Sequence, residues 1–250
     1  MEIILVDIHN HILPGIDDGP INDEETLQLV KNAAENGITH IIATPHHRNG
    51  TFNNNAPSIK YLVNKLNTYL KSKNIPITIF AGMEIHLHDD LLNDINSNLL
   101  SLADRKKYML IELPTNHLPQ FTSSTFFEMQ LRGYIPIIAH PERNTIIRQD
   151  PNRLFELVNS GALVQLNSSS ITGIHGRSLQ KFTLKLCKHN LVHFIASDAH
   201  SLQKRPFLLK SAFKYIQNKM STDYADFLKG NAVHVLNGTE FHTPPPVKFK

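Results

Sequence analysis

The chain has 250 residues, 41% of them hydrophobic, which is enough to bury the core of one barrel-sized domain. Its 25 basic and 22 acidic residues give a net charge of +3, well short of the clustered excess that marks a nucleic-acid surface. No signal peptide and no apolar run of about 18 residues is present. We therefore expect one domain over residues 1–250, a cytoplasmic location, no membrane insertion and no nucleic-acid partner.

Strands and helices are predicted to alternate along the chain. A strand at about 2–7 precedes a helix that begins near Asn22 and ends at Gly37, with Glu25 placed to complete a capping box. Further strands are expected at about 39–43, 77–84, 108–112, 135–139, 162–166 and 193–197. Helices are expected at about 57–71, 91–100, 123–132, 150–161 and 177–189, with more helix before a Pro-rich tail at about 243–250.

The predicted strands are apolar on both faces, as in LVQL and FIA, which is typical of buried parallel strands. No hairpin turn of the Asn-Gly type joins neighbouring strands. An open doubly wound sheet is possible, but chemically active residues at all seven strand ends favour a closed, barrel-like α/β arrangement.

Histidines and carboxylates recur at the downstream ends of these strands. Strand ends form one face in parallel α/β folds, so the side chains are expected to meet in one cleft as a multinuclear metal site. They are Asp7, His9 and His11 at the first strand, His46 and His47 at the second, then Glu84, Glu112 and His140, and finally Asp198 and His200.

Several of these groups also have ordinary structural interpretations. His9 and His11 are two residues apart, so an extended backbone directs both imidazoles to one side, although paired surface histidines are the alternative. Asp17 and Asp18 in PGIDDGP could be turn residues or could point at the same ions. A strand-end carboxylate such as Glu84 could form a salt bridge instead of binding metal.

Taken together, the motifs DIHNHILPGIDDG, ATPHH, Glu84, AHPER and SDAH resemble the polymerase and histidinol phosphatase (PHP) superfamily. Within it they resemble the bacterial protein-tyrosine phosphatases associated with capsule and exopolysaccharide loci. The resemblance runs from about Asp7 to Pro206. It implies a distorted (βα)7, TIM-like barrel with two or three divalent ions, usually manganese, although iron, zinc and cobalt suit the same ligands. The implied ligands are His9, His11, Asp18, His46, Glu84, Glu112, His140, Asp198 and His200.

The same resemblance assigns catalytic groups. Arg143 in AHPER matches a phosphate-binding arginine, and Arg205 in KRPF is a second candidate. His200 or His47 could serve as a general acid if one is needed. Other histidines fall outside the family pattern: His86, His88 and His175 are expected at the surface or rim, and His117 has no assigned role.

The activity implied is a metal-dependent protein-tyrosine phosphatase that uses metal-activated hydroxide. Its implied partner is the Tyr-rich tail of a bacterial tyrosine kinase. A small-molecule phosphatase such as histidinol phosphatase and a metal-stabilised binding module are the alternatives, and a homo-oligomer is possible. Thiol catalysis is not expected, because the only cysteine, Cys187, lies in an apolar stretch and is followed six residues later by His193 rather than arginine.

Overall fold

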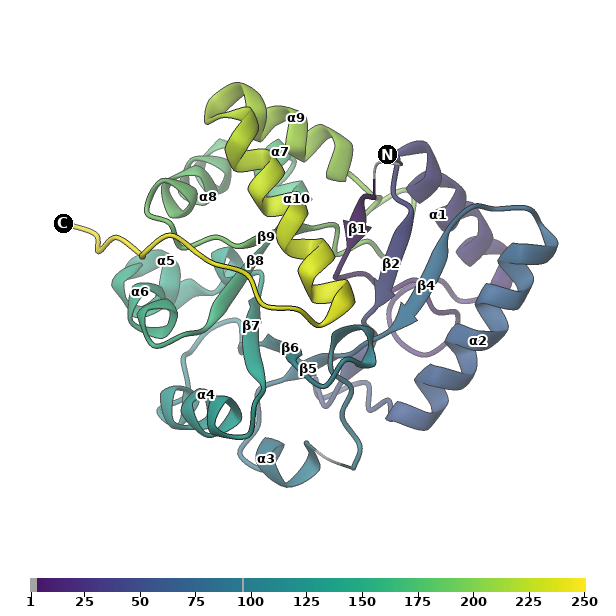
Figure 1. Ribbon diagram of the computed structural model, residues 1–250, viewed down its shortest axis with the longest axis horizontal. Helices are drawn as coiled ribbons and strands as arrows, with labels where there is room; N and C mark the ends of the chain where they lie inside the picture. The colour runs from purple at the N-terminus through teal and green to yellow at the C-terminus, as the bar shows by residue number, and fades with distance from the viewer. Residues whose placement is uncertain (1–3, 96) are drawn as a thin grey trace.

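The computed structural model describes residues 4–95 and 97–250 and shows parallel strands alternating with helices (Figure 1). The strands are β1 (Val6–Asp7), β2 (His40–Ala43), β3 (His46–His47), β4 (Thr78–Ala81), β5 (Glu84–His86), β6 (Tyr108–Glu112), β7 (Ile135–Ala139), β8 (Leu163–Asn167) and β9 (Phe194–Ala196). The helices are α1 (Asp23–Glu35), α2 (Ala56–Ser72), α3 (Leu91–Asp94), α4 (Thr122–Leu131), α5 (Thr145–Gln149), α6 (Asn152–Asn159), α7 (Ser168–Thr172), α8 (Arg177–Lys188), α9 (Leu209–Lys219) and α10 (Thr222–Asn237), with 3-10 turns η1 (Leu102–Asp104) and η2 (Pro141–Arg143).

The strands form two parallel sheets, β1-β2-β4 and β3-β5-β6-β7-β8-β9. A mixed α/β fold with parallel strands is therefore confirmed, but the described hydrogen-bond ladders do not run through one closed barrel. The chain passes from the first sheet to the second at Pro45, which has no N–H to continue a ladder, and at Gly82. A Cβ on Gly82 would lie 2.8 Å from the Ile42 side chain, so this crossing needs glycine.

The gap between β1 and β9 is bridged by side chains and by the segments that follow these strands. Asn10 forms a parallel bridge with Ala199. The buried Asp7 carboxylate accepts hydrogen bonds from the Ser197 hydroxyl and from the Ser197 N–H, the latter at 2.8 Å. Burial raises the pKa of Asp7 to about 6, although the Ser197 contacts oppose the change. Asp7 thus fastens the first strand to the last and is not directed at the ligand cluster.

Successive residues of the central strands point into two different apolar clusters. Leu110 and Ile137 belong to an inner cluster, which α10 covers with side chains such as Val235. Ile111 and Ile138 belong to an outer cluster against the surrounding helices. Both faces are therefore buried, which explains the continuous apolar runs in the sequence. Each fully buried Leu or Ile contributes about 1.5–3 kcal/mol.

Several element boundaries differ from those predicted. The strand expected at 77–84 is divided into β4 and β5, and the short strand β3 was missed. The helix expected at 91–100 was wrong beyond Asp94, because the described residues that follow form turns. Residues 2 and 3 of the first predicted strand lie outside the described residues.

Helix α1 begins close to the predicted position. The Asn22 side chain accepts hydrogen bonds from the N–H groups of Glu24 and Glu25, and Glu25 reaches back to the Ile21 N–H at 3.1 Å. None of the helices in the described ranges is both long and apolar enough to cross a membrane.

Candidate active site

Most of the predicted ligands lie at or just after the carboxyl ends of strands, whereas His46 and Glu84 begin the short strands β3 and β5. Each of the nine belongs to at least one of four sets of donor atoms that lie within 4.8 Å of one another. His9, His11, His46 and Glu84 each belong to two sets, so the sets form one continuous cluster. The sets are His11, Asp18, His46 and His200; His9, His11 and Glu84; His9, His140 and Asp198; and His46, Glu84 and Glu112.

Glu84 lies at the centre of this cluster and is completely buried. Its Oε2 atom is 3.3 Å from the Nε2 atoms of both His9 and His11, and 3.0 Å from His46 Nδ1. Its Oε1 atom is 2.9 Å from His140 Nε2. No lysine or arginine pairs with Glu84 in the described part of the chain. Within the described residues, Glu84 therefore does not form the alternative salt bridge to a lysine or an arginine.

Two carboxylate oxygens of the ligand cluster are buried and have no hydrogen-bond partner among residues 4–95 and 97–250. They are Glu84 Oε2 and Asp198 Oδ1, and the latter lies 3.5 Å from the Nε2 atoms of His9 and His11. An unsatisfied buried carboxylate oxygen is costly, and a divalent cation removes that cost. The donor set therefore fits a group of divalent ions.

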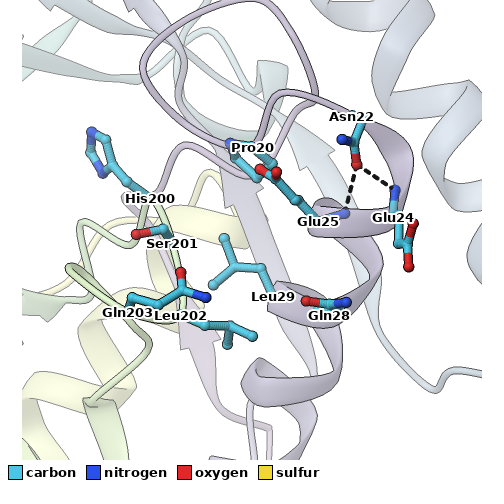
Figure 2. A pocket seen from close by; sticks show the side chains of 10 residues that line it. All are labelled: Pro20, Asn22, Glu24, Glu25, Gln28, Leu29, His200, Ser201, Leu202 and Gln203. Carbon is cyan, nitrogen blue, oxygen red and sulfur yellow. Dashed lines mark hydrogen bonds between the residues drawn. The ribbon is translucent and has the colours of Figure 1, made fainter.

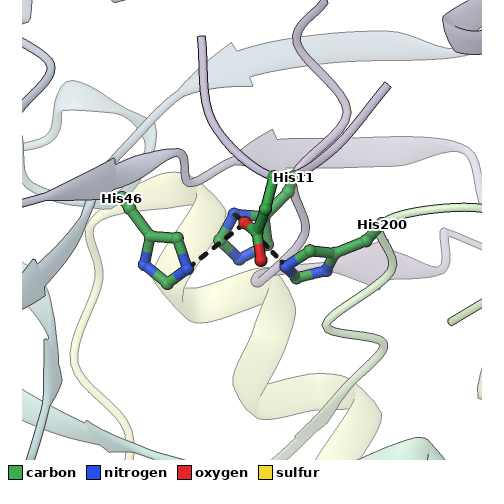
Figure 3. Close-up of side chains that lie close together, drawn as sticks. His11, His46 and His200 are labelled. Carbon is green, nitrogen blue, oxygen red and sulfur yellow. Dashed lines mark ion pairs between the residues drawn. The ribbon is translucent and has the colours of Figure 1, made fainter. Parts of the chain in front are cut away.

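A second part of the cluster surrounds Asp18. Figure 3 shows the imidazoles of His11, His46 and His200 directed at one carboxylate. Asp18 Oδ1 lies 3.2 Å from His200 Nε2 and 3.5 Å from His46 Nε2. Asp18 is about half exposed, with 48% of its side chain accessible, so this part of the cluster is open to solvent.

Burial opposes charge on the site histidines, but the carboxylates outweigh it at His9, His11 and His46, although not at His200, whose pKa is lowered. Burial lowers the pKa of His9, yet Glu84 and Asp198 raise it above its ordinary value. Burial also lowers the pKa of His11, but Asp17 above all, together with Asp198 and Glu84, raises it well above its ordinary value. Burial raises the pKa values of Glu84 and Asp198, but His9 and its neighbours hold both well below the usual range. The carboxylates therefore keep negative charge that protons or metal cations must balance.

Outer contacts fix the orientation of the imidazoles. His11 Nδ1 donates to Asp17 Oδ2 at 2.7 Å, so its Nε2 faces the cluster. Asp17 also accepts from the Gly19 N–H at 3.0 Å. A Cβ on Gly19 would lie 2.1 Å from the His11 carbonyl oxygen, so only glycine lets the turn approach this closely. The Asp-Asp-Gly motif thus supplies both an orienting carboxylate and a candidate ligand.

Two amides on β8 connect the histidine side of the cluster to Asp198. His9 Nδ1 donates to Gln165 Oε1 at 2.9 Å. Gln165 Nε2 then donates to Asn167 Oδ1 at 2.9 Å, and Asn167 Nδ2 donates to Asp198 Oδ2 at 2.6 Å. Sequence reasoning missed these two residues, although their alternation within LVQLN places two amides on one face of a buried strand.

Both candidate arginines lie beside Asp198. Arg143 Nη1 donates to Asp198 Oδ2 at 3.1 Å, and Arg205 Nη2 donates to the same oxygen. Arg205 Nη1 also lies 2.8 Å from His200 Nε2. The arginine side chains are 40% and 29% exposed, so each presents N–H groups to the adjoining cavity. The cavity has a volume of about 270 Å³, and Glu84, Glu112 and His140 also line it.

Two residues of the site have left-handed backbone conformations. His140 has φ 33° and Asp198 has φ 54°. Such conformations carry a cost of about 1–3 kcal/mol for non-glycine residues and occur often at functional sites. Here they lie at the ends of β7 and β9, where the chain turns to place an imidazole and a carboxylate in the cluster.

A second cavity of about 390 Å³ lies on the other side of His200 (Figure 2). It is formed by the beginning of α1 and by residues 200–203, and its lining includes Asn22, Glu24 and Gln28. Among the predicted ligands only His200 lines it, so it is distinct from the ligand cluster.

The remaining histidines take different positions. His175 is exposed and contacts Ser169, in agreement with the rim expectation. His86 Nδ1 lies 3.2 Å from Glu112 Oε2, which makes it a neighbour of the cluster. The rim prediction was wrong for His88, whose side chain is only 13% exposed and whose ring centroid lies 6.1 Å from that of His47. The His117 carbonyl accepts a hydrogen bond from Asn144.

Similar proteins are known from both sequence and structure. The family described as capsular polysaccharide synthesis, CpsB/CapC, matches residues 5–237. The tyrosine-protein phosphatase YwqE of Bacillus subtilis is 41% identical over 247 residues, which cover 98% of this chain and 97% of YwqE. The putative tyrosine-protein phosphatase CapC of Staphylococcus aureus is 44% identical over 236 residues, which cover 93% of this chain and 92% of CapC.

Solved structures resemble the whole chain. One comes from work on YwqE of Bacillus subtilis and CpsB of Streptococcus pneumoniae, described as unique metal-dependent tyrosine phosphatases. It superposes with a TM-score of 0.96 at 39% identity and covers 98% of this chain and 100% of that chain. An organophosphorus hydrolase from Deinococcus radiodurans superposes with a TM-score of 0.56 at 11% identity, covering 93% of this chain and 92% of the other. That second likeness concerns the fold alone.

Proposed function

Since the chain belongs to the capsular polysaccharide synthesis family CpsB/CapC, we propose that it is a metal-dependent protein-tyrosine phosphatase. The observation that carries this proposal is the pair of unsatisfied buried oxygens, Glu84 Oε2 and Asp198 Oδ1, with two arginines on the other oxygen of Asp198. Cys187 is buried, and burial raises the pKa of its thiol to about 12. No thiolate is then present near neutral pH to act as a nucleophile.

The ligand cluster is proposed to hold two or three divalent ions. Manganese is our choice, although mixed nitrogen and oxygen ligands also suit iron, zinc or cobalt. Such ions supply hydroxide near neutral pH and stabilise negative charge on phosphoryl oxygens. The side chains proposed to bind them are His9, His11, Asp18, His46, Glu84, Glu112, His140, Asp198 and His200.

Arg143 and Arg205 are proposed to bind the phosphoryl group of the substrate. A planar guanidinium can direct two N–H groups at an oxyanion, which gives orientation as well as charge. Asp198 holds both arginines through its Oδ2 atom, and Asn167 donates to that same oxygen. The carboxylate therefore orients the arginines towards the cavity before the substrate arrives.

His200 is proposed as a metal ligand; to protonate the leaving phenolate it would need a proton on Nε2, the atom at which the Arg205 guanidinium donates. Its Nδ1 atom contacts the Asp198 carbonyl oxygen at 3.0 Å, so its Nε2 atom is directed at Asp18 and Arg205. A phenolate is a comparatively good leaving group, so a dedicated acid contributes less here than for an alkyl phosphate.

We propose further that the two sheets are parts of one distorted (βα)7 barrel. The Asn10–Ala199 bridge and the Asp7–Ser197 contacts join the first and last strands, which supports closure. The inner apolar cluster supports it too, because strands of both sheets contribute to it through residues such as Ile42 and Ile137. A layered inner core of this kind is typical of parallel barrels.

The proposed substrate is a phosphotyrosine peptide, of which the Tyr-rich tail of a bacterial tyrosine kinase is our candidate. The arginines are partly exposed at the cavity, which would allow an extended peptide to reach them. A cytoplasmic location and a homo-oligomeric state stay predictions.

Comparing hydrolysis by metal-stripped protein before and after metal is added tests the proposal. Adding Mn²⁺ should restore hydrolysis of p-nitrophenyl phosphate, whereas a metal-stabilised binding module would stay inactive. The same loaded preparation should then hydrolyse a phosphotyrosine peptide with a higher kcat/KM than histidinol phosphate. The reverse preference would favour a small-molecule phosphatase and would contradict the substrate proposed here.

A further inference from the structure

Positive charge is concentrated in one part of the chain, which includes helices α8 and α9. Of the 25 basic and 22 acidic residues, nine basic residues and one acidic residue fall within residues 157–222. That acidic residue, Asp198, is buried in the ligand cluster. The rest of the chain has 16 basic and 21 acidic residues, so the net charge of +3 hides a strong asymmetry.

Helix α8 carries a stripe of basic side chains on its exposed side. The stripe consists of Arg177, Lys181, Lys185 and Lys188, which are three or four residues apart and all exposed. Residues with this spacing lie on one side of a helix. Within residues 4–95 and 97–250, no carboxylate forms an ion pair with any of the four. Their charge is therefore available to a partner outside the protein.

The C-terminal segment is fastened beside this stripe and adds to it. The buried Phe249 ring stacks on His189, with ring centroids 3.7 Å apart, and Lys185 Nζ lies 4.9 Å from the Phe249 centroid. The Val247 N–H donates to the His189 carbonyl at 2.8 Å. These contacts place the exposed Lys248 near the end of α8.

Helix α9 extends the positive surface. It contributes the exposed residues Lys210 and Lys214, and α7, which has no charged residue, contacts both α8 and α9 (Figure 1). Carboxylates return on helices α6 and α10 with Glu156 and Asp223, which limits the surface on either side. The basic face defined in this way consists of Arg177, Lys181, Lys185, Lys188, Lys210, Lys214 and Lys248.

Exposed apolar side chains lie at both ends of α8. Ile174, in the loop before the helix, is 59% exposed, and Val247, beside its last turn, is 48% exposed. The large aromatic side chains that are exposed in the described ranges, Tyr61, Phe121 and Phe127, lie on α2 or at α4. The basic face thus combines lysines with single aliphatic side chains and lacks an exposed ring on which a nucleic-acid base could stack.

We propose that the basic face binds the surface of an anionic lipid bilayer, with Ile174 and Val247 entering the headgroup layer. Clusters of about four to eight lysines and arginines bind anionic lipids, and each such charge strengthens binding by about fivefold. The face follows the outer side of the helices, which suits a bilayer surface, and aliphatic side chains among basic ones are typical of proteins that bind at this interface. The binding does not depend on the phosphatase activity proposed above.

Sedimentation with lipid vesicles tests the proposal. Full-length protein is mixed with vesicles of phosphatidylcholine alone, or of phosphatidylcholine and phosphatidylglycerol in equal amounts, and the bound fraction is measured. The protein should bind the anionic vesicles more tightly, and added salt should weaken this binding because it screens the charges. Equal binding to both kinds of vesicle, or no binding to anionic vesicles at low salt, would overturn the proposal.

A pair of double variants locates the binding surface. Lys181→Gln with Lys188→Gln removes two charges from the basic face and should lower the affinity for anionic vesicles by about 25-fold. The control, Lys60→Gln with Lys65→Gln, removes two exposed charges from α2 on the other side of the fold (Figure 1) and should bind like wild type. Equal vesicle affinities of the two double variants would overturn the proposal.

The variant Ile174→Ser distinguishes a bilayer from a soluble polyanion. It should lower the affinity for anionic vesicles by about tenfold, because a buried aliphatic side chain is lost from the headgroup layer. Circular dichroism checks that the variant is folded. Unchanged vesicle affinity in folded Ile174→Ser, with tighter binding of wild type to polyglutamate or duplex DNA than to vesicles, would assign the basic face to an acidic macromolecule and overturn the proposal.

Discussion

The orienting role of Asp17 gives the most specific prediction for the ligand cluster. We expect Asp17→Asn to weaken Mn²⁺ binding while leaving the protein folded. The Asp17 side chain is 1% exposed and contacts His11 Nδ1 at 2.7 Å. A hydrogen bond to a charged group contributes about 1.5–3 kcal/mol, and about 1.4 kcal/mol corresponds to a tenfold change in affinity. The affinity for the ion held by His11 should therefore fall by about 10- to 150-fold.

Isothermal titration of metal-stripped protein with Mn²⁺ measures this change. The matched control is Asp23→Asn, since Asp23 pairs with Lys65 on the surface and its side chain is 56% exposed. The control should bind Mn²⁺ like wild type, because exposed pairs contribute about 0–1 kcal/mol. Mn²⁺ affinity within twofold of wild type in Asp17→Asn would refute the orienting role of this carboxylate.

Three further changes test other parts of the account. Arg143→Ala should lower kcat/KM for a phosphotyrosine peptide by about 100-fold or more with metal content retained. The control Arg153→Ala changes an exposed arginine and should not lower it. Equal kcat/KM in Arg143→Ala and wild type would show that Arg143 does not bind the phosphate. Cys187→Ala should keep hydrolysis within about twofold of wild type, and a large loss in a folded protein would reopen thiol catalysis. Burial lowers the pKa of His193 from 6.5 to about 4. Between these pH values the unfolded chain takes up a proton at His193 that the folded chain does not. The free energy of unfolding should therefore fall by up to about 3 kcal/mol from pH 6.5 to pH 4. His193→Asn can still accept the Val164 N–H hydrogen bond and should flatten this dependence in urea unfolding; parallel curves would contradict it.

The positions of the ligands were predictable because parallel strands end at one face. His9, Glu84, His140 and Asp198 follow four different strands, and each apolar run ends where its polar residue begins. Strand period and chain order therefore suffice to place these side chains in one cleft. Their roles as ligands stay proposals, supported by the unsatisfied oxygens of Glu84 and Asp198.

The outer contacts were not predictable for a physical reason. Asp17 and Asp18 are adjacent in a turn, and only the backbone path through Gly19 decides which one contacts His11 Nδ1 and which one faces the open side. Gln165 and Asn167 carry no charge and lie within an apolar strand, so their hydrogen bonds to His9 and Asp198 appear only in three dimensions. Residues that act through a ligand leave little trace in composition or spacing.

The division of the predicted third strand has a similar origin. The run from 77 to 84 is continuous in hydrophobicity, and the break at Gly82 arises because the chain must pass close to Ile42. The hydrophobicity of the sequence depends on the polarity of each residue and not on how closely a neighbouring strand approaches. One strand was therefore predicted where β4 and β5 occur.

Anomalous diffraction at the manganese edge, from crystals grown with Mn²⁺, tests the central claim most directly. We predict two or three strong peaks among the ligand cluster, with Glu84 Oε2 and Asp198 Oδ1 within coordination distance of them. Ordered side chains without anomalous signal, and with those two oxygens bonded only to protein groups or water, would contradict the account.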